Sequence, residues 1–262
     1  MRINRTRERL KAGKTVLGCA IQGYRSSEIP RVLAVAGFDY FFIDMEHGGF
    51  DLETAQDMIA NGAAAGITPV VRVAELHYSL VARLLDVGAQ GIILPRVEDP
   101  LLLEEALSWM RYPPGGKRGF GVMPTIIDYE QHSMAAMMEH LNQNTLTVVQ
   151  FETRLAMERA DELLAVAGID VAMVGPADLT VSLGIPGQFD DPVLLETVER
   201  FVAKCNAYGV APGIHCRSAA LAKPWLERGM RLIGGGSEQM LLIERSKAAV
   251  AELRAGIAAL DE

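Results

Sequence analysis

Short apolar runs alternate with amphipathic segments along the whole chain. Eight such runs occupy residues 15–21, 38–44, 68–73, 91–95, 145–151, 171–175, 210–214 and 231–235. Runs of this length that are continuously apolar are typical of strands buried on both faces of a parallel sheet. Between them, apolar residues recur at intervals of three and four, as on the buried face of a helix, for example in 51–66, 76–88 and 193–209. These segments end at a glycine, the residue that most readily adopts the left-handed conformation after a helix.

The repeated order of strand, helix and glycine predicts the fold. Parallel strands connected by helices that cover the sheet form α/β structures, and eight strand–helix units close into a (β/α)₈ barrel. The chain has 262 residues, a length that suits one such barrel better than two smaller domains. We therefore expect residues 1–262 to form a single TIM-barrel domain.

Composition narrows the class of protein. The formal net charge of -8 leaves no basic surface for a nucleic-acid backbone, and no stretch approaches the 18 or so apolar residues of a membrane span. The basic N-terminal residues are not followed by the apolar segment of a secretory signal. Three cysteines, Cys19, Cys205 and Cys216, show no disulfide pattern and favour a reducing compartment. We expect a cytoplasmic enzyme that acts on small-molecule substrates and has no nucleic-acid or membrane partner.

Polar residues follow several of the predicted strands. In a (β/α)₈ barrel the catalytic groups lie at the C-terminal ends of the strands. The residues found there are Asp44, Glu46, His47, Arg72, Gln150, Glu152 and Asp178. Each one alone has an ordinary explanation, such as a favourable position at a helix N-terminus or a surface ion pair. A charged set gathered on one rim, however, would be costly without a ligand or metal to compensate it.

Two of these residues suggest a metal site. Glu152 and Asp178 follow successive predicted strands, 26 positions apart. Carboxylates are the ligands that hard divalent cations such as Mg²⁺ prefer, with water and substrate oxygens at the remaining positions. Two carboxylates do not by themselves discriminate among Mg²⁺, Mn²⁺, Co²⁺ and Zn²⁺. The sequence therefore predicts an enzyme that depends on a divalent metal ion.

Longer motifs reveal a family resemblance. The chain resembles the HpcH/HpaI aldolase family in five segments, which are FDYFFIDMEHGGFD (38–51), GAQGIILPRVEDP (88–100), YPPGGKRGFG (112–121), QFE (150–152) and GPADL (175–179). The resemblance between this chain and that family extends over about residues 15–250. Members of that family are metal-dependent class II pyruvate aldolases that act on 4-hydroxy-2-oxo acids. The resemblance implies a barrel of the phosphoenolpyruvate/pyruvate type. It also implies cleavage to pyruvate and an aldehyde through the enolate of metal-bound pyruvate.

The resemblance assigns roles to individual residues. It implies that Glu152 and Asp178 hold the metal, and that His47 is the acid/base residue linked to Asp44. It also implies that Arg72 contacts the keto oxygen of pyruvate and that Gln150 lies near the water molecules bound to the metal. The pyruvate carboxylate would bind at the backbone of Gly175, Pro176 and Ala177. The chemistry is consistent with these residue types, because a histidine titrates near neutral pH and an arginine can stabilise an enolate oxygen.

The lysines argue against Schiff-base chemistry. Such an aldolase needs a lysine inside the barrel, and none of the six lysines falls within a predicted strand. Two hypotheses from other classes of function stay open. One is a related metal-enolate lyase, either an oxaloacetate decarboxylase or a citrate-lyase-like enzyme acting on a CoA ester. The other is a catalytically silent barrel with a binding or assembly role.

Further expectations concern loops and assembly. The irregular segment 111–131 resembles the part of the family that covers the site, and we expect it to overhang the barrel mouth. Residues 234–238 (GGGSE) are either an anion site or a tight turn, and His215 and Cys216 are either structural or contacts for the aldehyde. The resemblance implies hexamers built from dimers that exchange the last helix. The segment 238–260 has an apolar stripe suited to such a neighbour.

Overall fold

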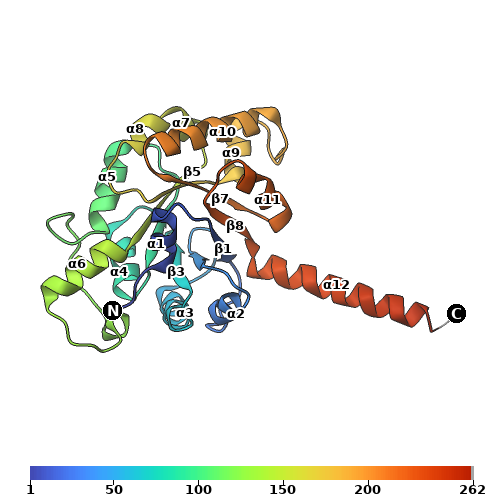
Figure 1. The fold of residues 1–262 in the computed structure, drawn as a ribbon, viewed down its shortest axis with the longest axis horizontal. Coiled ribbons are helices and arrows are strands. Elements are labelled where there is room, and N and C mark those ends of the chain that lie inside the picture. Colours follow the sequence, from blue (N-terminus) through green and yellow to red (C-terminus); the bar gives the residue numbers. More distant parts are fainter. Residues whose placement is uncertain (261–262) are drawn as a thin grey trace.

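Eight parallel strands close into a barrel in the order in which they occur along the chain. The computed structural model describes residues 1–260. The strands are β1 (Val16–Ile21), β2 (Tyr40–Asp44), β3 (Thr68–Arg72), β4 (Gly91–Leu94), β5 (Leu146–Phe151), β6 (Val171–Val174), β7 (Ala211–Cys216) and β8 (Leu232–Ser237), and β8 pairs with β1 (Figure 1). Each of the eight predicted apolar runs overlaps one of them, with β7 and β8 each extending two residues further, so the predicted TIM barrel is confirmed. The last two residues of the predicted domain 1–262 lie outside the described residues.

Helices connect the strands and surround the barrel. They are α1 (Arg5–Lys11), α2 (Ile29–Val35), α3 (Leu52–Ala64), α4 (Tyr78–Asp86), α5 (Pro100–Trp109), α6 (Met134–Asn144), α7 (Arg154–Glu158), α8 (Ala160–Leu164), α9 (Pro176–Leu183), α10 (Pro192–Ala207), α11 (Ala219–Glu227) and α12 (Glu238–Ala258), with a 3₁₀ turn at Pro124–Ile127. Several begin at a side-chain cap, as where Asp51 accepts a hydrogen bond from the amide of Thr54 and Ser218 accepts one from Leu221. Such caps satisfy backbone donors that the helix itself leaves free.

The strands bury two apolar layers. One lies between the barrel and its helices, and the other fills the barrel itself with side chains such as Tyr40, Phe42, Val148 and Met173. Tyr40 depends on a glycine opposite it, since a Cβ at Gly18 would lie 2.1 Å from the Tyr40 ring. Helix α1 closes the N-terminal end of the barrel, where its Leu10 joins the interior layer. The barrel is therefore a packed core, which leaves the opposite, C-terminal end for chemistry.

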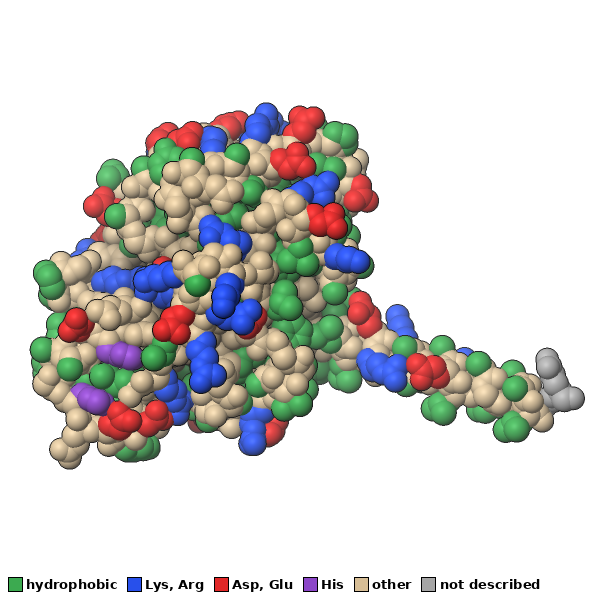
Figure 2. Space-filling model, in the orientation of Figure 1, with side chains coloured by type: hydrophobic (Ala, Val, Ile, Leu, Met, Phe, Trp, Pro, Cys, Tyr) green, Lys and Arg blue, Asp and Glu red, His purple; other side chains and the backbone are tan. Residues whose placement is uncertain are grey.

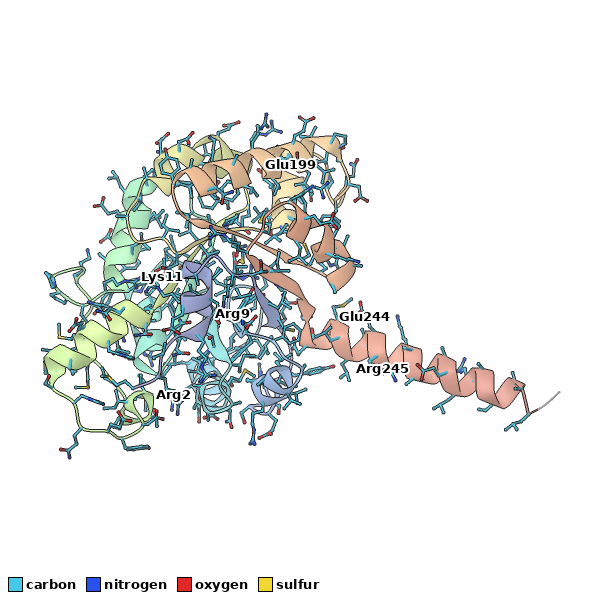
Figure 3. All side chains as sticks on the ribbon, viewed as in Figure 1. Arg2, Arg9, Lys11, Glu199, Glu244 and Arg245 are labelled. Atoms are coloured by element: carbon cyan, nitrogen blue, oxygen red, sulfur yellow. The ribbon has the colours of Figure 1, made fainter. Side chains whose placement is uncertain are left out.

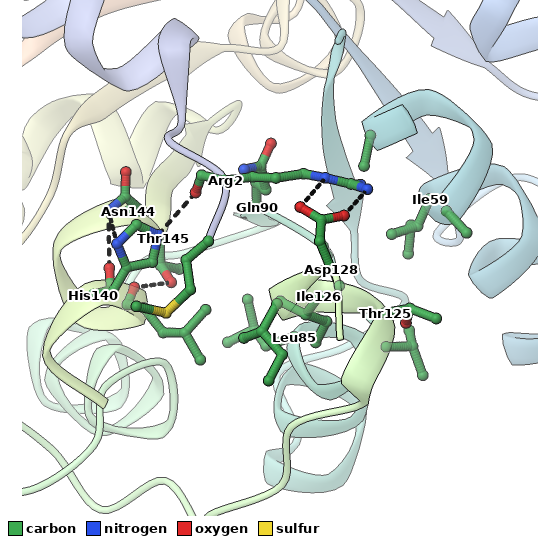
Figure 4. Close-up of a pocket in the computed structure, with 18 of the residues that line it drawn as sticks. Arg2, Ile59, Leu85, Gln90, Thr125, Ile126, Asp128, His140, Asn144 and Thr145 are labelled. Atoms are coloured by element: carbon green, nitrogen blue, oxygen red, sulfur yellow. Dashed lines mark hydrogen bonds and ion pairs between the residues drawn. The ribbon is translucent and has the colours of Figure 1, made fainter. Parts of the chain in front are cut away.

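The segment 111–131 lies at the N-terminal end of the barrel, and its predicted place over the mouth is wrong. Arg118 is buried and pairs with Asp86, which ends α4, at 2.6 Å. A cavity of about 210 Å³ at this end is bordered by Ile126, by Gln90 directly before β4 and by Thr145 directly before β5 (Figure 4). The physical reason is that α5 follows β4 and returns the chain to the N-terminal end before the segment begins. Because this cavity is far from the strand ends that carry the polar residues, we do not take it as the active site.

Helix α12 projects away from the barrel (Figure 1). Leu242, Val250, Leu253 and Ile257 are each at least half exposed on it. Hydrophobic side chains recur along the helix in the space-filling view (Figure 2). Because successive members of this set are separated by eight, three and four residues, they share one face of the helix. Within residues 1–260, no helix is both long enough and apolar enough to cross a membrane.

Candidate active site

A cavity of about 440 Å³ opens at the C-terminal end of the barrel. Most of the site residues predicted from the sequence border it, namely His47, Arg72, Gln150, Gly175, Pro176, Ala177 and Asp178. The other two, Asp44 and Glu152, are buried directly behind this lining and bind to it through hydrogen bonds. The structure thus brings the predicted set together on one rim.

Arg72 and Asp44 form the central ion pair of the rim. Adjacent strands β2 and β3 place the two residues opposite each other. The guanidinium donates from Nε to Oδ1 at 3.0 Å and from Nη2 to Oδ2 at 2.6 Å. Burial acts to raise the pKa of Asp44, but the hydrogen bond and the charge of Arg72, together with the hydrogen bonds from Gln22 and the His47 amide, hold it below its ordinary value. Asp44 is therefore ionised at neutral pH and fixes the plane of the guanidinium.

Asp44 also shapes the turn that carries His47. Its Oδ1 accepts hydrogen bonds from the backbone amides of Glu46 at 3.2 Å and His47 at 3.1 Å. Gly48 completes this turn, because a Cβ there would lie 2.2 Å from the Asp44 carbonyl oxygen. The expected link between Asp44 and His47 therefore runs through the backbone and not through the imidazole. The ring itself is exposed, with Glu46 Oε2 at 3.8 Å from its Nε2.

Arg72 is connected to Glu152 through Gln150. Its Nη1 donates to Gln150 Oε1 at 3.4 Å, and Gln150 Nε2 donates in turn to Glu152 Oε2. The second oxygen of Glu152 accepts from the backbone amide of Arg96 at 2.9 Å. Gly175 on the neighbouring strand end is required here, since a Cβ would lie 2.8 Å from Glu152 Oε2. A continuous polar chain thus joins the ends of β2, β3 and β5.

The carboxylates around Glu152 are suited to a divalent cation. Burial raises the pKa of Glu152, and the charges of Glu46 and Asp178 raise it further against the hydrogen bond from Gln150. Glu46 Oε2 is buried without a hydrogen bond and lies 3.3 Å from Arg72 Nη1 in an ion pair. Neither Glu152 nor Asp178 forms an ion pair with a lysine or arginine of residues 1–260, and carboxylate oxygens of this kind favour a hard cation. Among residues 1–260 no three Asp, Glu, His or Cys side chains are grouped closely enough to hold a metal by themselves. Two carboxylates completed by water and substrate oxygens therefore fit the residues best.

The start of α9 borders the same cavity. Gly175 precedes the helix, and Pro176, Ala177 and Asp178 form its first turn. The first amides of a helix have no acceptor within it, and the helix dipole favours an anion at this end. This turn is suited to a carboxylate group of a small ligand.

His215 borders the cavity from β7. Its ring lies edge-on to Phe42 with centroids 4.9 Å apart, and its Nδ1 is buried without a hydrogen bond. A Cβ at Gly234 would lie 1.9 Å from Nδ1, so this ring needs a glycine on the neighbouring strand. Residues 234–237 belong to β8 and Glu238 begins α12, so the predicted tight turn is not found, and the alternative of an anion site stays a prediction. Within this segment it is Gly234 that makes room for the imidazole.

The sequence analysis missed Gln22. This residue directly follows β1 and its Nε2 donates to Asp44 Oδ2 at 3.0 Å. Its position after a strand was a usable signal, because the other rim residues were found in this way. An uncharged side chain on an exposed loop was not considered.

His215 generates a prediction about pH and stability. Burial and, to a smaller extent, the charge of Arg72 together lower its pKa from an ordinary value of 6.5 to about 4, against the opposing charge of Asp44. Between pH 4 and 6.5 the unfolded chain therefore binds a proton that the folded chain does not, so stability falls as the pH falls through this window. We expect His215→Leu to reduce the loss of melting temperature between pH 6.5 and 4, measured by calorimetry. The same dependence in wild type and variant would show that His215 is not the group responsible.

Comparisons with known proteins identify the family that shares this sequence and fold. The sequence profile of the family described as HpcH/HpaI aldolase/citrate lyase matches residues 24–245. The 4-hydroxy-2-oxo-heptane-1,7-dioate aldolase of Salmonella dublin is 33% identical over 252 residues, covering 96% of this chain and 95% of that protein. An HpcH/HpaI aldolase from Desulfitobacterium hafniense DCB-2 has a similar crystal structure, with a TM-score of 0.89 and 30% identity over 94% of this chain and 95% of that one. The crystal structure of the citrate synthase SbnG is also similar, with a TM-score of 0.83 and 28% identity over 95% of this chain and 97% of that one.

Proposed function

Because the chain belongs to the HpcH/HpaI aldolase/citrate lyase family, we propose that it is a metal-dependent aldolase that cleaves 4-hydroxy-2-oxo acids to pyruvate and an aldehyde. The observation that carries this proposal is the polar chain from Asp44 through Arg72 and Gln150 to Glu152, with Asp178 beside it. It places a cationic donor and two carboxylates at one end of a cavity large enough for a small substrate. A barrel with only a structural role would have no need of such an arrangement.

The donor half of the substrate fits the rim between β3 and β6. The first turn of α9 receives the pyruvate carboxylate through backbone amides. Arg72 faces the keto oxygen with its guanidinium already oriented by Asp44. A divalent cation held by Glu152 and Asp178 would polarise the keto group, so that negative charge can develop on its oxygen. Arg72 stabilises that charge without rearrangement, the condition under which such donors are most effective.

His47 is suited to move the proton. In the cleavage direction a base takes the proton of the C4 hydroxyl, the C4–O electrons form the aldehyde carbonyl, and the C3–C4 bond breaks. The electron pair of that bond becomes the enolate of pyruvate, which then takes a proton at C3. The His47 ring borders the cavity and is exposed, so it can exchange protons with solvent between these steps. Asp44 places the ring by holding the backbone of its turn.

A lysine-based mechanism does not fit the described barrel. None of the eight strands contains a lysine, and Lys117, in the segment 111–131 at the N-terminal end of the barrel, forms an exposed ion pair with Glu105. The Schiff base of a class I aldolase requires a lysine next to the substrate carbonyl.

The acceptor half of the substrate would occupy the rest of the cavity. Beyond the pyruvate position its lining includes His215, Leu221, Trp225 and Met240. The wall also includes the charged side chains of Asp190, Arg217 and Arg228, so it combines apolar and polar groups. A cavity of about 440 Å³ favours an aldehyde with a short carbon chain over a bulky CoA ester.

We predict that activity depends on the two carboxylates through a divalent ion. Excess chelator should abolish the formation of 4-hydroxy-2-oxo acids from pyruvate and a panel of aldehydes, read by mass spectrometry, and added Mg²⁺ or Mn²⁺ should restore it. Glu152→Gln and Asp178→Asn should lose metal binding and activity together, because each removes one of the two anionic ligands. Glu158→Gln, an exposed carboxylate at the end of α7, serves as the matched control.

Full activity in metal-free protein, with removal verified by metal analysis, would contradict this mechanism. Turnover of oxaloacetate or of a citrate-like substrate, with no aldol product from any aldehyde, would instead support the related lyase activity.

The proton-transfer role of His47 gives a second prediction. His47→Ala should slow aldol cleavage by roughly 10²- to 10⁴-fold, the usual contribution of a general acid/base, and leave metal binding intact. Arg72→Lys should lose roughly 10²-fold or more, because an ammonium cannot reproduce the planar pair of donors. His132→Ala, which alters a half-buried histidine at the other end of the barrel, is the control for effects away from the site. Wild-type rates of His47→Ala between pH 6 and 9 would show that another group moves the proton.

We also propose that α12 packs against a second copy of this chain, in an assembly that the family resemblance suggests is a hexamer. The support is the apolar face of Leu242, Val250, Leu253 and Ile257, which the described chain leaves uncovered. Exposed apolar surface of this extent usually marks an interface. A second copy is the occupant we favour, because closed symmetric assemblies of one chain are the commonest oligomers.

This assembly can be tested on the two faces of α12. Leu253→Glu combined with Ile257→Glu should reduce the mass measured by light scattering from a multiple of the chain mass to smaller species. Ala251→Glu combined with Ala255→Glu adds the same charge to the opposite face of the helix and should leave the mass unchanged. A wild-type protein with the mass of one chain would rule out the assembly.

A further inference from the structure

Helix α12 begins directly at the active-site rim. Its first residue, Glu238, is only 5% exposed. One carboxylate oxygen, Oε1, accepts hydrogen bonds from three successive backbone amides, those of Gln22 at 3.1 Å, Gly23 at 2.7 Å and Tyr24 at 2.9 Å. The other, Oε2, accepts from Gln22 at 3.0 Å. A buried carboxylate is costly unless it is hydrogen-bonded in this way. Glu238 therefore anchors the loop that follows β1.

The contact between this loop and α12 is closely fitted. A Cβ at Gly23 would lie 2.0 Å from Nε2 of Gln239, the second residue of the helix. The Gln239 amide group therefore lies directly against the backbone of this loop, so the loop and the first turn of α12 are in contact at this point as well as at Glu238.

Glu238 does not serve as the cap of its own helix. The side chain of Ser237 takes that place and accepts from the amide of Met240. Both oxygens of Glu238 are instead directed to the loop after β1, and no lysine or arginine of residues 1–260 forms an ion pair with it. A role limited to the helix dipole does not explain these contacts.

The anchored loop reaches the catalytic arginine. Gln22 donates from Nε2 to Asp44 Oδ2 at 3.0 Å, and the same oxygen accepts from Arg72 Nη2 at 2.6 Å. Since Gln22 is itself exposed, its backbone contact with Glu238 is what fixes it at the rim. One chain of contacts therefore runs from the start of α12 to the arginine.

From these contacts we infer that Glu238 is a positioning residue for Arg72, acting through Gln22 and Asp44. The inference rests on the proposed function, in which Arg72 stabilises the enolate oxygen. It adds that the seating of α12 on the barrel is a condition for activity. We propose above that a second copy of this chain holds α12. The first residue of that helix, Glu238, thus joins it to the reacting centre.

Two variants each break one step in the series of contacts from Glu238 to Asp44. Glu238→Gln keeps the volume but directs an NH₂ group at amide donors, so the loop should loosen. Gln22→Met leaves the backbone contacts with Glu238 in place and removes only the bond to Asp44. Each should lower the metal-dependent exchange of pyruvate methyl protons for deuterium by roughly 10- to 100-fold, the scale expected for small misplacements of a catalytic group. Glu238→Asp keeps both acceptor oxygens and should recover most of the rate.

The double variant distinguishes positioning from general destabilisation. If Glu238 acts through Gln22, the combined variant should exchange pyruvate no more slowly than the slower single variant, because the second change breaks a link already lost. Amide hydrogen exchange of residues 22–24 should increase in Glu238→Gln and stay as in wild type in Gln22→Met. Glu244→Gln, an exposed carboxylate further along α12 (Figure 3), should change neither measurement.

Multiplying losses in the double variant, or unchanged protection of residues 22–24 in Glu238→Gln, would overturn this inference. A wild-type protein that exchanges no pyruvate protons in the presence of Mg²⁺ or Mn²⁺ would overturn the proposed function itself. The amide exchange would still show separately whether Glu238 anchors the loop.

Discussion

The buried ion pair between Arg72 and Asp44 is the interaction on which the rest of the rim depends. An arginine and an aspartate this deep in a barrel would be destabilising unless their geometry were good and their remaining hydrogen-bonding atoms were satisfied. Both conditions are met, because the strands place the residues in register and Gln22, Gln150 and two backbone amides complete the contacts. The pair thereby holds the guanidinium in one orientation before any substrate arrives. Preorganisation of this kind is what electrostatic catalysis requires.

The two ends of the barrel have separate tasks. At the N-terminal end, α1 and the segment 111–131 cover the core, and their charged groups form pairs, as where Arg118 binds Asp86. At the C-terminal end Glu152 and Asp178 form no ion pair within residues 1–260, and burial, with a smaller contribution from the charges of Glu46 and Asp178, raises the pKa of Glu152. Stability and chemistry are thus separated along the barrel axis, so the rim can keep an unfavourable charge balance that a ligand relieves.

The sequence was sufficient for the fold and for most of the rim. The strand pattern has one simple cause, burial on both faces, and residues just past a strand must lie at the C-terminal end. The segment 111–131 was misplaced because its position depends on α5, whose return path a loop-length argument ignores. The contacts of Glu238 and Gln22 were missed because they join residues more than 200 positions apart through backbone amides, which carry no sequence signature. The link between Asp44 and His47 was expected, but a backbone bond cannot be distinguished from a side-chain bond by spacing alone.

The most direct test of this account is a crystal structure of the protein with Mn²⁺ and oxalate, a stable mimic of the pyruvate enolate. The account predicts anomalous density for Mn²⁺ between Glu152 and Asp178, with one oxalate oxygen facing the Arg72 guanidinium and the Arg72–Asp44 pair unchanged. A metal ion bound elsewhere, or an oxalate that makes no contact with Arg72, would contradict it.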